Sequence, residues 1–357
     1  MFRRLLLILL GIGVATAFAE IALRLTDRIP DVNNPLYSFH DADPGLGWRG
    51  KANARMRFRR PEFNVVIAHD AEGWRLPDPP RPERPLRRVL VLGDSFTWGW
   101  GVSQGQVFTD RLQQRLAPDV AIYNRGVNGF GTAQEYLLME RQLEAEHFDA
   151  VLVMFFQNDI TDNVSSKDGR RPFFELDGDR LVPRNQPARR LLNPVERFLK
   201  DHSRAYQLLD FQFGRVGRAL FQDDEDAWQN TDDGADVDYH AVTGGPVTLR
   251  ILQEMHRVAA AHGARLILVY LPHRSEIEGD HGRNANIRGA HALTQDFAAT
   301  DNVPLVDLTG PFHDHTARGE RLIYAHDEHW QPAGHALAAD VLVASGLLGA
   351  DRVPPPQ

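Results

Sequence analysis

From residue 88 onward, short apolar runs alternate with longer segments that have helical periodicity. The apolar runs, rich in Val, Ile and Leu, are Arg88–Leu92, Val120–Asn124, Ala150–Phe156, Arg265–Leu271 and Pro304–Leu308. The segments with helical spacing are Phe108–Leu116, Thr132–His147, Val247–His262, a helix that contains Thr294–Thr300, and Ala333–Ala344. Strands that are apolar on both faces and separated by helices are typical of a parallel sheet covered on both sides. The sequence therefore predicts a three-layer α/β/α domain around a five-stranded parallel sheet.

This domain is expected to span residues 86–350, with one long interruption at 164–245. The interruption leaves the sheet just after the carboxyl end of the third strand, where it can roof a site or pack on the side. Residues 26–85 precede the domain and are expected to be extended and irregular, with one short strand at Phe63–Ile67. They end in a proline-rich spacer at 77–85, which favours neither a helix nor a central strand.

Residues 1–25 form a separate segment, in which Arg3 and Arg4 precede a mostly apolar run from Leu5 to Leu23. Such a run, as a helix, is close to the roughly 30 Å of a bilayer's hydrocarbon core. Positive charges stay on the cytoplasmic side, so the body of the protein is expected on the periplasmic or extracytoplasmic side of the inner membrane. Small residues at 15–19 leave open the alternative of a cleaved signal peptide and a secreted protein.

Composition excludes several classes of function. The formal net charge of −8 argues against a nucleic-acid partner, because composition forces no basic face. The chain has no cysteine, which excludes disulfides, thiolate metal sites and thiol catalysis. Histidines at 313, 315, 326 and 329 leave a metal site as a minor alternative, but they lack the usual spacing of paired ligands. No metal or cofactor is therefore expected.

Polar residues follow the first three predicted strands where each strand ends. Ser95 comes after the first strand, a glycine-rich loop after the second, and Asn158 after the third. The carboxyl ends of parallel strands meet at one edge of a sheet, which is where α/β folds bind ligands. Ser95 offers a hydroxyl and a backbone N–H, and the Asn158 amide offers a further donor. A glycine N–H from the second loop would complete a three-donor oxyanion hole, and Gly126, Gly129 and Gly131 are all candidates.

A serine is a poor nucleophile near its ordinary pKa and needs a general base. His329, far along the chain, is the candidate base, and Asp327 is placed to orient its imidazole. The sequence therefore predicts a nucleophile, base and orienting carboxylate made by Ser95, His329 and Asp327.

Four blocks in this order resemble the SGNH (GDSL) hydrolase superfamily. They are Gly93–Thr97, Asn124–Gly129, Asn158–Asp159, and Asp327–His329 followed by Pro332–His335. The resemblance covers roughly residues 86–346 and implies a flavodoxin-like fold with Ser95, His329 and Asp327 as catalytic residues. It selects Gly129 as the oxyanion glycine, beside Ser95 and Asn158. Further segments at 45–48, 72–75 and 93–102 resemble a bacterial subgroup that carries an N-terminal membrane anchor.

The chain departs from the family pattern at two places. Phe156 stands where many members have a glycine, and Asp327 lies two rather than three residues before His329. The shorter spacing resembles alginate O-acetyltransferase-like members and favours acyl transfer to a sugar. From the family resemblance as a whole we expect a serine esterase that acts on a small-molecule or carbohydrate ester and removes O-acyl groups, such as O-acetyl groups, from envelope carbohydrate. The alternatives are an O-acyltransferase that uses the same acyl-enzyme and a non-catalytic envelope binding protein.

Overall fold

The computed structural model describes residues 2–26, 39–166, 169–186, 244–279 and 285–349, with some positions between 195 and 209. Its central sheet has five parallel strands in the order β11-β10-β7-β5-β6. These strands are β5 (Arg87–Leu92), β6 (Val120–Asn124), β7 (Ala150–Phe155), β10 (Arg265–Tyr270) and β11 (Leu305–Asp307). Each coincides with a predicted strand to within a residue or two, so the expected five-stranded parallel sheet is confirmed.

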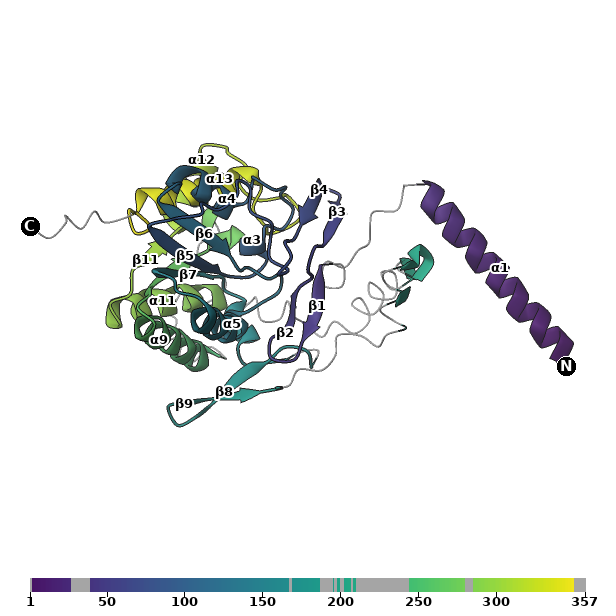
Figure 1. Cartoon of the computed structure of the whole chain (residues 1–357), viewed down its shortest axis with the longest axis horizontal. Coiled ribbons are helices and arrows are strands. Elements are labelled where there is room, and N and C mark those ends of the chain that lie inside the picture. The colour runs from purple at the N-terminus through teal and green to yellow at the C-terminus, as the bar shows by residue number, and fades with distance from the viewer. Residues whose placement is uncertain are drawn as a thin grey trace, which may run out of the picture.

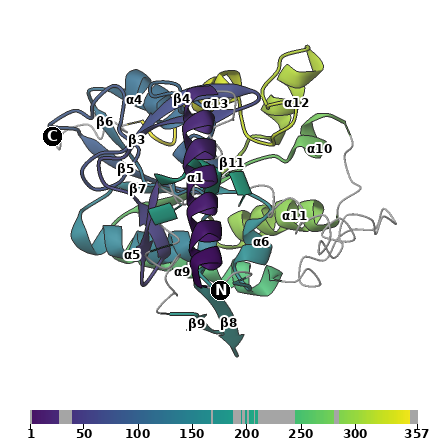
Figure 2. The ribbon, with the colours of Figure 1, turned by 90° about the vertical axis from the view of Figure 1, so that its right-hand side faces the viewer.

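Helices cover both faces of the sheet, as Figures 1 and 2 show. One face carries α5 (Thr132–Ala145), α9 (Gly245–Ala261) and α11 (Ala285–Thr300). The other carries α4 (Phe108–Leu116), α12 (Thr309–Ala317) and α13 (Pro332–Ala344). Three helices of four residues lie at strand ends, namely α3 (Ser95–Trp98), α6 (Asp159–Asp162) and α10 (Arg274–Ile277). The α/β/α layering predicted from the sequence is therefore present.

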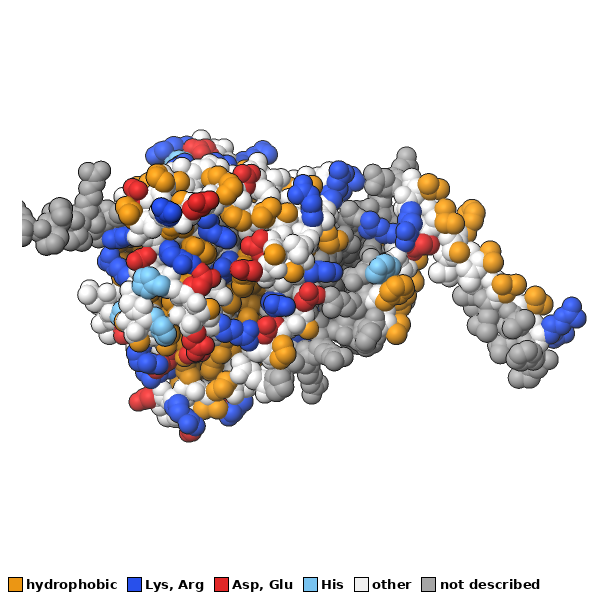
Figure 3. All heavy atoms as spheres, in the orientation of Figure 1, with side chains coloured by type: hydrophobic (Ala, Val, Ile, Leu, Met, Phe, Trp, Pro, Cys, Tyr) orange, Lys and Arg blue, Asp and Glu red, His pale blue; other side chains and the backbone are white. Residues whose placement is uncertain are grey.

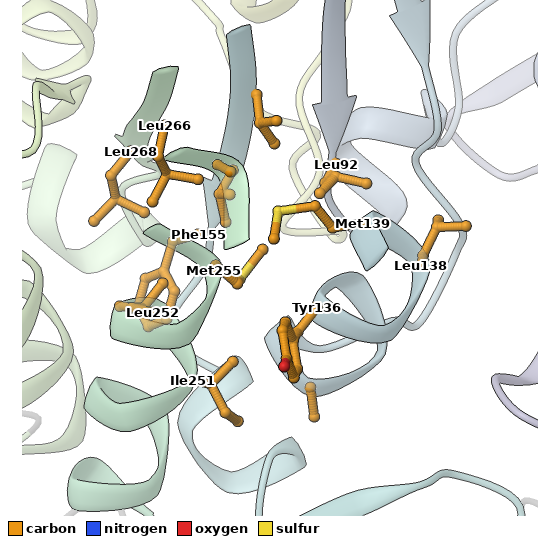
Figure 4. Close-up of a cluster of buried hydrophobic side chains, with 14 of the residues drawn as sticks. Leu92, Tyr136, Leu138, Met139, Phe155, Ile251, Leu252, Met255, Leu266 and Leu268 are labelled. Carbon is orange, nitrogen blue, oxygen red and sulfur yellow. The ribbon is translucent and has the colours of Figure 1, made fainter. Parts of the chain in front are cut away.

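Two apolar clusters, one on each face of the sheet, hold the layers together. Alternate residues of each strand point to opposite faces, so Leu92 joins the cluster under α5 and α9 while Val91 joins the other. Figure 4 shows the first cluster, where Met139 of α5 and Met255 of α9 meet the strand side chains. Both methionines are fully buried. On the face drawn in Figure 3, acidic and basic side chains are interspersed.

The strand order places a topological switch between β5 and β7. The chain runs outward from β5 to β6, then returns to β7 on the other side of β5 and continues to β10 and β11. Loops that leave neighbouring strands in opposite directions open a crevice at the carboxyl edge, where such folds bind ligands. Ser95 follows β5 and Asn158 follows β7, so the two residues flank this crevice.

The segment before the sheet is more regular than expected. The predicted short strand is present as β4 (Phe63–Ala68), and it pairs with β3 (Arg55–Arg60) in an antiparallel hairpin. A second hairpin joins β1 (His40–Asp43) to β2 (Gly47–Gly50). The expectation of an irregular segment was wrong here because β3 is rich in arginine. Its hydrophobic signal reduces to Met56 and the fully buried Phe58.

The insertion begins with a hairpin that the sequence did not predict, β8 (Phe173–Asp177) and β9 (Arg180–Arg184). Most of its remainder, from 187 to 243, lies outside the described residues. At the N-terminus, α1 (Phe2–Thr26) is a helix. Across the part of the chain that is described, no helix combines the length and the apolar character needed to cross a membrane. The membrane anchor expected from residues 1–25 is therefore not shown.

Candidate active site

Ser95 lies where β5 turns sharply into α3. A side chain at Gly93 would place its Cβ 2.1 Å from Thr97 Oγ1, so the turn requires glycine there. Asp94 then caps α3 by accepting a hydrogen bond from Phe96 N–H at 2.8 Å. Ser95 is the first residue of α3 and is 8% exposed. The predicted turn after the first strand thus presents a nearly buried hydroxyl at the edge of the sheet.

The structure brings Ser95, His329 and Asp327 into one hydrogen-bonded chain. His329 Nε2 lies 2.6 Å from Ser95 Oγ, although the two residues are 234 positions apart. On the other side of the ring, His329 Nδ1 is hydrogen-bonded to Asp327 Oδ1, and His329 N–H donates to the same oxygen at 3.0 Å. A proton on Nδ1 leaves Nε2 free to accept the serine proton. This arrangement can activate a serine for nucleophilic attack.

Asp327 is held in its charged form. Burial by itself raises the pKa of this carboxyl, but hydrogen bonds from His329 and from Trp100 Nε1 outweigh burial and keep the pKa below its usual range. The indole donor lies 2.9 Å from Asp327 Oδ2. An ionised Asp327 fixes the orientation of His329 and stabilises the imidazolium that forms when His329 takes a proton.

Two side chains hold the loop that carries Asp327 and His329. Glu62, at the β3–β4 turn, accepts hydrogen bonds from Ala325 N–H at 2.7 Å and His326 N–H at 3.0 Å. Arg274 of α10 donates to the carbonyl oxygens of Tyr324 and Asp327, the latter at 2.9 Å. Sequence reasoning missed both residues, because neither lies near a recognisable motif. The loop is thus fastened to the N-terminal hairpin and to the end of β10.

The loop after β6 lies against the nucleophile loop. Val127 N–H donates to Gly93 O at 3.0 Å. Gly126 is packed against α3, since a Cβ there would lie 2.5 Å from the Trp98 nitrogen. Gly129 instead has a positive φ of 78°, and a Cβ added there would lie 3.5 Å from the Trp48 ring. Neither Ser95 N–H nor Gly129 N–H donates to another residue of the described chain, so both donors are open.

Asn158, at the end of β7, lies beside these loops. Its Nδ2 donates to Asp162 Oδ2 at 3.2 Å, which uses one of the two amide hydrogens and leaves the second for another acceptor. Thr132 Oγ1 donates to Asp159 Oδ2 at 2.9 Å and so ties this loop to the start of α5. All five predicted site residues therefore lie on loops that gather at the carboxyl edge of the sheet, where the chemistry of acyl transfer is possible.

Three buried carboxyl groups lie behind the site. Burial raises the pKa of Asp94 to about 7, despite the bond from Phe96 N–H. Burial and mutual repulsion raise the pKa values of Glu135 and Asp159 well above the usual range. Within the described residues, both carboxyl oxygens of Glu135 lack a hydrogen-bond partner. The raised pKa values favour the protonated form of each group in the pH range where an ordinary carboxyl group is charged, and the sequence offered no signal that the three would be buried together.

The remaining sequence candidates take other places. Phe156, at the family's glycine position, is 3% exposed and packs on Phe96, with 4.9 Å between ring centroids. Its bulk therefore lies within the core. His315 pairs with Glu320 on the surface. Of the residues that the structure describes, no group of three has the side chains and placement to hold a metal ion.

The matched segment decides the family. Residues 91–337, which include all four sequence blocks, match the model of the GDSL-like lipase/acylhydrolase family. The chain belongs to this family. It is an ester-bond hydrolase of the GDSL type, and the fold described above is consistent with that assignment.

Solved structures to which this chain is similar include GDSL proteins and esterases. The match to a lipolytic G-D-S-L family protein from Veillonella parvula has 13% sequence identity and a TM-score of 0.42. It covers 72% of this chain and 96% of the Veillonella protein. A lipase/acylhydrolase from Enterococcus faecalis shares 15% over 72% of this chain and 94% of its own, with a TM-score of 0.42. The acetyl xylan esterase AlAXEase shares 14% over 72% and 98%, with a TM-score of 0.44. Among curated proteins, none matches the chain.

Proposed function

We propose that this GDSL hydrolase is a serine esterase that removes O-acyl groups through an acyl-serine intermediate. The observation that carries the proposal is the hydrogen-bonded chain from Ser95 through His329 to Asp327, with 2.6 Å between the hydroxyl and the imidazole. A base within hydrogen-bond reach of a nucleophile, itself oriented by a carboxylate, is the arrangement that activates serine in acyl transfer.

The proposed reaction has two halves. Ser95 Oγ attacks the acyl carbonyl carbon while His329 Nε2 takes the hydroxyl proton, and the carbonyl oxygen becomes an oxyanion. The N–H groups of Ser95 and Gly129 and the Asn158 amide donate to that oxygen, as in other oxyanion holes. The carbon–oxygen bond to the alcohol then breaks, and His329 gives the proton to the departing alcohol. A water molecule, deprotonated by His329, attacks the acyl-serine, releases the carboxylic acid and restores Ser95.

For the substrate we propose an O-acetylated envelope carbohydrate. The resemblance of the Asp327 to His329 spacing to alginate O-acetyltransferase-like members supports a sugar substrate, and it also favours a second candidate function. In that function a carbohydrate hydroxyl, in place of water, accepts the acyl group from Ser95. The two functions differ only in the acceptor that reaches the intermediate.

An assay with a chromogenic acetyl ester, with and without an O-deacetylated polysaccharide acceptor, tests these functions. An esterase releases acetate at a rate that the acceptor does not change, whereas a transferase acetylates the acceptor. A fluorophosphonate probe should label the wild type and leave Ser95→Ala unlabelled. Folded wild-type protein that neither reacts with the probe nor turns over any ester would contradict the proposal and favour a non-catalytic binding protein.

We also propose that residues 1–25 direct export, so that the hydrolase domain works outside the cytoplasm. The support is the order of charge and apolarity, with Arg3 and Arg4 before the apolar run. Alkaline phosphatase fused after residue 349 should be active in a bacterial host. The mature N-terminal sequence and membrane fractionation then separate a retained anchor from a cleaved signal. An inactive, cytoplasmic fusion would exclude export.

A further inference from the structure

We propose that two side chains from outside the central sheet and its covering helices, Trp48 and Arg171, position the oxyanion hole. The inference rests on the proposed esterase function, because it concerns the donors that stabilise the transition state. It assigns a role to the N-terminal hairpins and to the first part of the insertion.

In the Val127–Phe130 turn, the direction of the Gly129 N–H depends on what holds the peptide between Asn128 and Gly129. Phe130 N–H donates to Val127 O at 3.0 Å, and Gly129, in the third position, has a φ of 78°. A positive φ at the third residue is the pattern of a type II turn. The central peptide of this turn joins Asn128 to Gly129. Asn128 C=O and Gly129 N–H belong to that one planar trans peptide and point in opposite directions. A group that holds the Asn128 oxygen therefore sets the direction of the Gly129 N–H.

Trp48 of β2 is that group. Its Nε1 donates to Asn128 O at 3.0 Å. The indole is 4% exposed and packs edge-on against Phe130, with 5.7 Å between centroids, so its donor cannot swing away. A hydrogen bond to the carbonyl of an amide also polarises the N–H of the same amide. Trp48 thus both directs and polarises the Gly129 N–H donor.

Arg171 holds the next peptide and the second loop. Its Nη2 donates to Gly129 O at 2.9 Å, and its Nη1 pairs with Asp162. Asp162 in turn accepts the Asn158 amide at 3.2 Å. The guanidinium is a planar fork with fixed donor directions, so one side chain sets the spacing between the Gly129 and Asn158 loops. It also lies 5.8 Å from the Trp48 ring, which joins the two supports.

Both supports come from segments that are not part of the sheet. Trp48 precedes the family match, which begins at residue 91. Arg171 lies between β7 and β8, in the segment that leaves the sheet beside Asn158. Sequence reasoning placed the donors by their strand ends but had no signal for the residues that aim them.

The test compares Trp48→Phe and Arg171→Gln with a control, Tyr136→Phe. The control also loses the hydrogen bond of a mostly buried aromatic side chain, from Tyr136 Oη to Glu140 at 2.8 Å, but it leaves the Asn128–Gly129 peptide and the nucleophile helix alone. For each protein, kcat and KM are measured on a chromogenic acetyl ester, together with Ki for an alkylboronic acid that forms a tetrahedral anion on Ser95, and Tm. Because loss of a whole oxyanion donor costs 10²–10³ in turnover, misdirection of one should lower kcat about tenfold or more.

The expected result is a fall in kcat with little change in KM, and an equal fall in boronate affinity, in Trp48→Phe and Arg171→Gln only. A loss of kcat no larger than that of the control at equal Tm would overturn the proposal, as would a loss of kcat without a loss of boronate affinity. If Trp48→Phe fails to fold, the variants of the partly exposed Arg171 still test the proposal. Arg171→Lys can reach only one of the two acceptors, Gly129 O or Asp162, so its kcat should lie between those of the wild type and Arg171→Gln. A wild type that turns over no ester would contradict the proposed esterase function. In that case the affinity of the boronate for Ser95, compared among the variants, still tests whether Trp48 and Arg171 position the oxyanion donors.

Discussion

The indole of Trp100 lies nearly flat against the imidazole of His329, with 4.9 Å between the ring centroids and 20° between the planes. The same indole donates through Nε1 to Asp327 Oδ2 at 2.9 Å. One side chain therefore restrains the ring plane of the base and satisfies the outer oxygen of its carboxylate partner. Phe96 packs on His329 as well, 4.9 Å between centroids, so the base is confined by aromatic rings.

We expect Trp100→Phe to lower kcat about tenfold, equivalent to ~1.4 kcal/mol, with a small change in KM. Phenylalanine keeps a ring against His329 but removes a donor to a charged carboxylate, and such bonds are worth roughly 1.5–3 kcal/mol. The pKa of Asp327 should move up toward its usual range, since the indole bond is among the causes that lower it. Steady-state kinetics at a series of pH values measure both the fall in kcat and its pH dependence. Full activity in the variant would show that the stacking alone positions the base.

Glu62→Gln should reduce kcat by several-fold and leave KM close to the wild-type value. The carboxylate accepts from two backbone N–H groups of the loop that carries His329, whereas an amide offers one acceptor and sets its NH₂ against the other N–H. Glu83→Gln, at an exposed position in the proline-rich spacer, is the matched control. Equal kcat values in the two variants would mean that Arg274 is sufficient to hold the loop.

Because of the buried carboxyl groups, we expect the free energy of unfolding to fall as pH rises. The pKa of Asp94 is raised from 3.8 to about 7, so between these values the folded protein binds more protons than the unfolded chain. By linkage the free energy of unfolding decreases with pH across this window, and the raised pKa values of Glu135 and Asp159 act in the same direction. The stabilisation is fully present below pH 4 and is lost through pH 7.

Asp94→Asn isolates one of these groups. The amide oxygen can still accept from Phe96 N–H, but the side chain no longer titrates. The difference in unfolding free energy between pH 4 and pH 7.5 should shrink by up to about 4 kcal/mol, on the order of three pKa units. Urea denaturation at both pH values measures it, with Asp179→Asn at the exposed β8–β9 turn as the control. If the unfolding free energy of Asp94→Asn depends on pH as strongly as that of the wild type, the titration of Asp94 is not its cause.

Met255→Ala should destabilise the fold without altering the chemistry. Met255 is fully buried between α9, α5 and the sheet (Figure 4). Removing such a side chain costs about 2–5 kcal/mol, because a cavity remains. Met255→Leu, which conserves volume, should cost under about 1.5 kcal/mol. Thermal unfolding and the specific activity of the folded protein check the expectation, and a fall in kcat at low temperature would contradict it.

The sheet and its strand ends could be predicted because their signals are local. Buried parallel strands need continuous apolar residues, and the carboxyl ends of parallel strands meet at one edge. The sequence therefore placed Ser95, the glycine-rich loop after the second strand and Asn158 together, and the family resemblance selected Gly129 within that loop. In the N-terminal segment the sequence predicted only β4. Its partner β3 escaped prediction because it exposes arginines and buries little besides Phe58. Short strands of this kind owe their order to the surface that they cover.

The sequence by itself determined the α/β/α class, the residues at the strand ends and the pairing of a serine with a histidine and a carboxylate. Only the tertiary structure decided that His329 lies against Ser95, that Glu62 and Arg274 fasten its loop, and that Trp48 and Arg171 hold the Gly129 peptide. The physical reason is the range of the interactions. Strands and turns depend on neighbours in sequence, whereas a hydrogen bond across 234 residues exists only after the core has packed and brought both partners to the same edge.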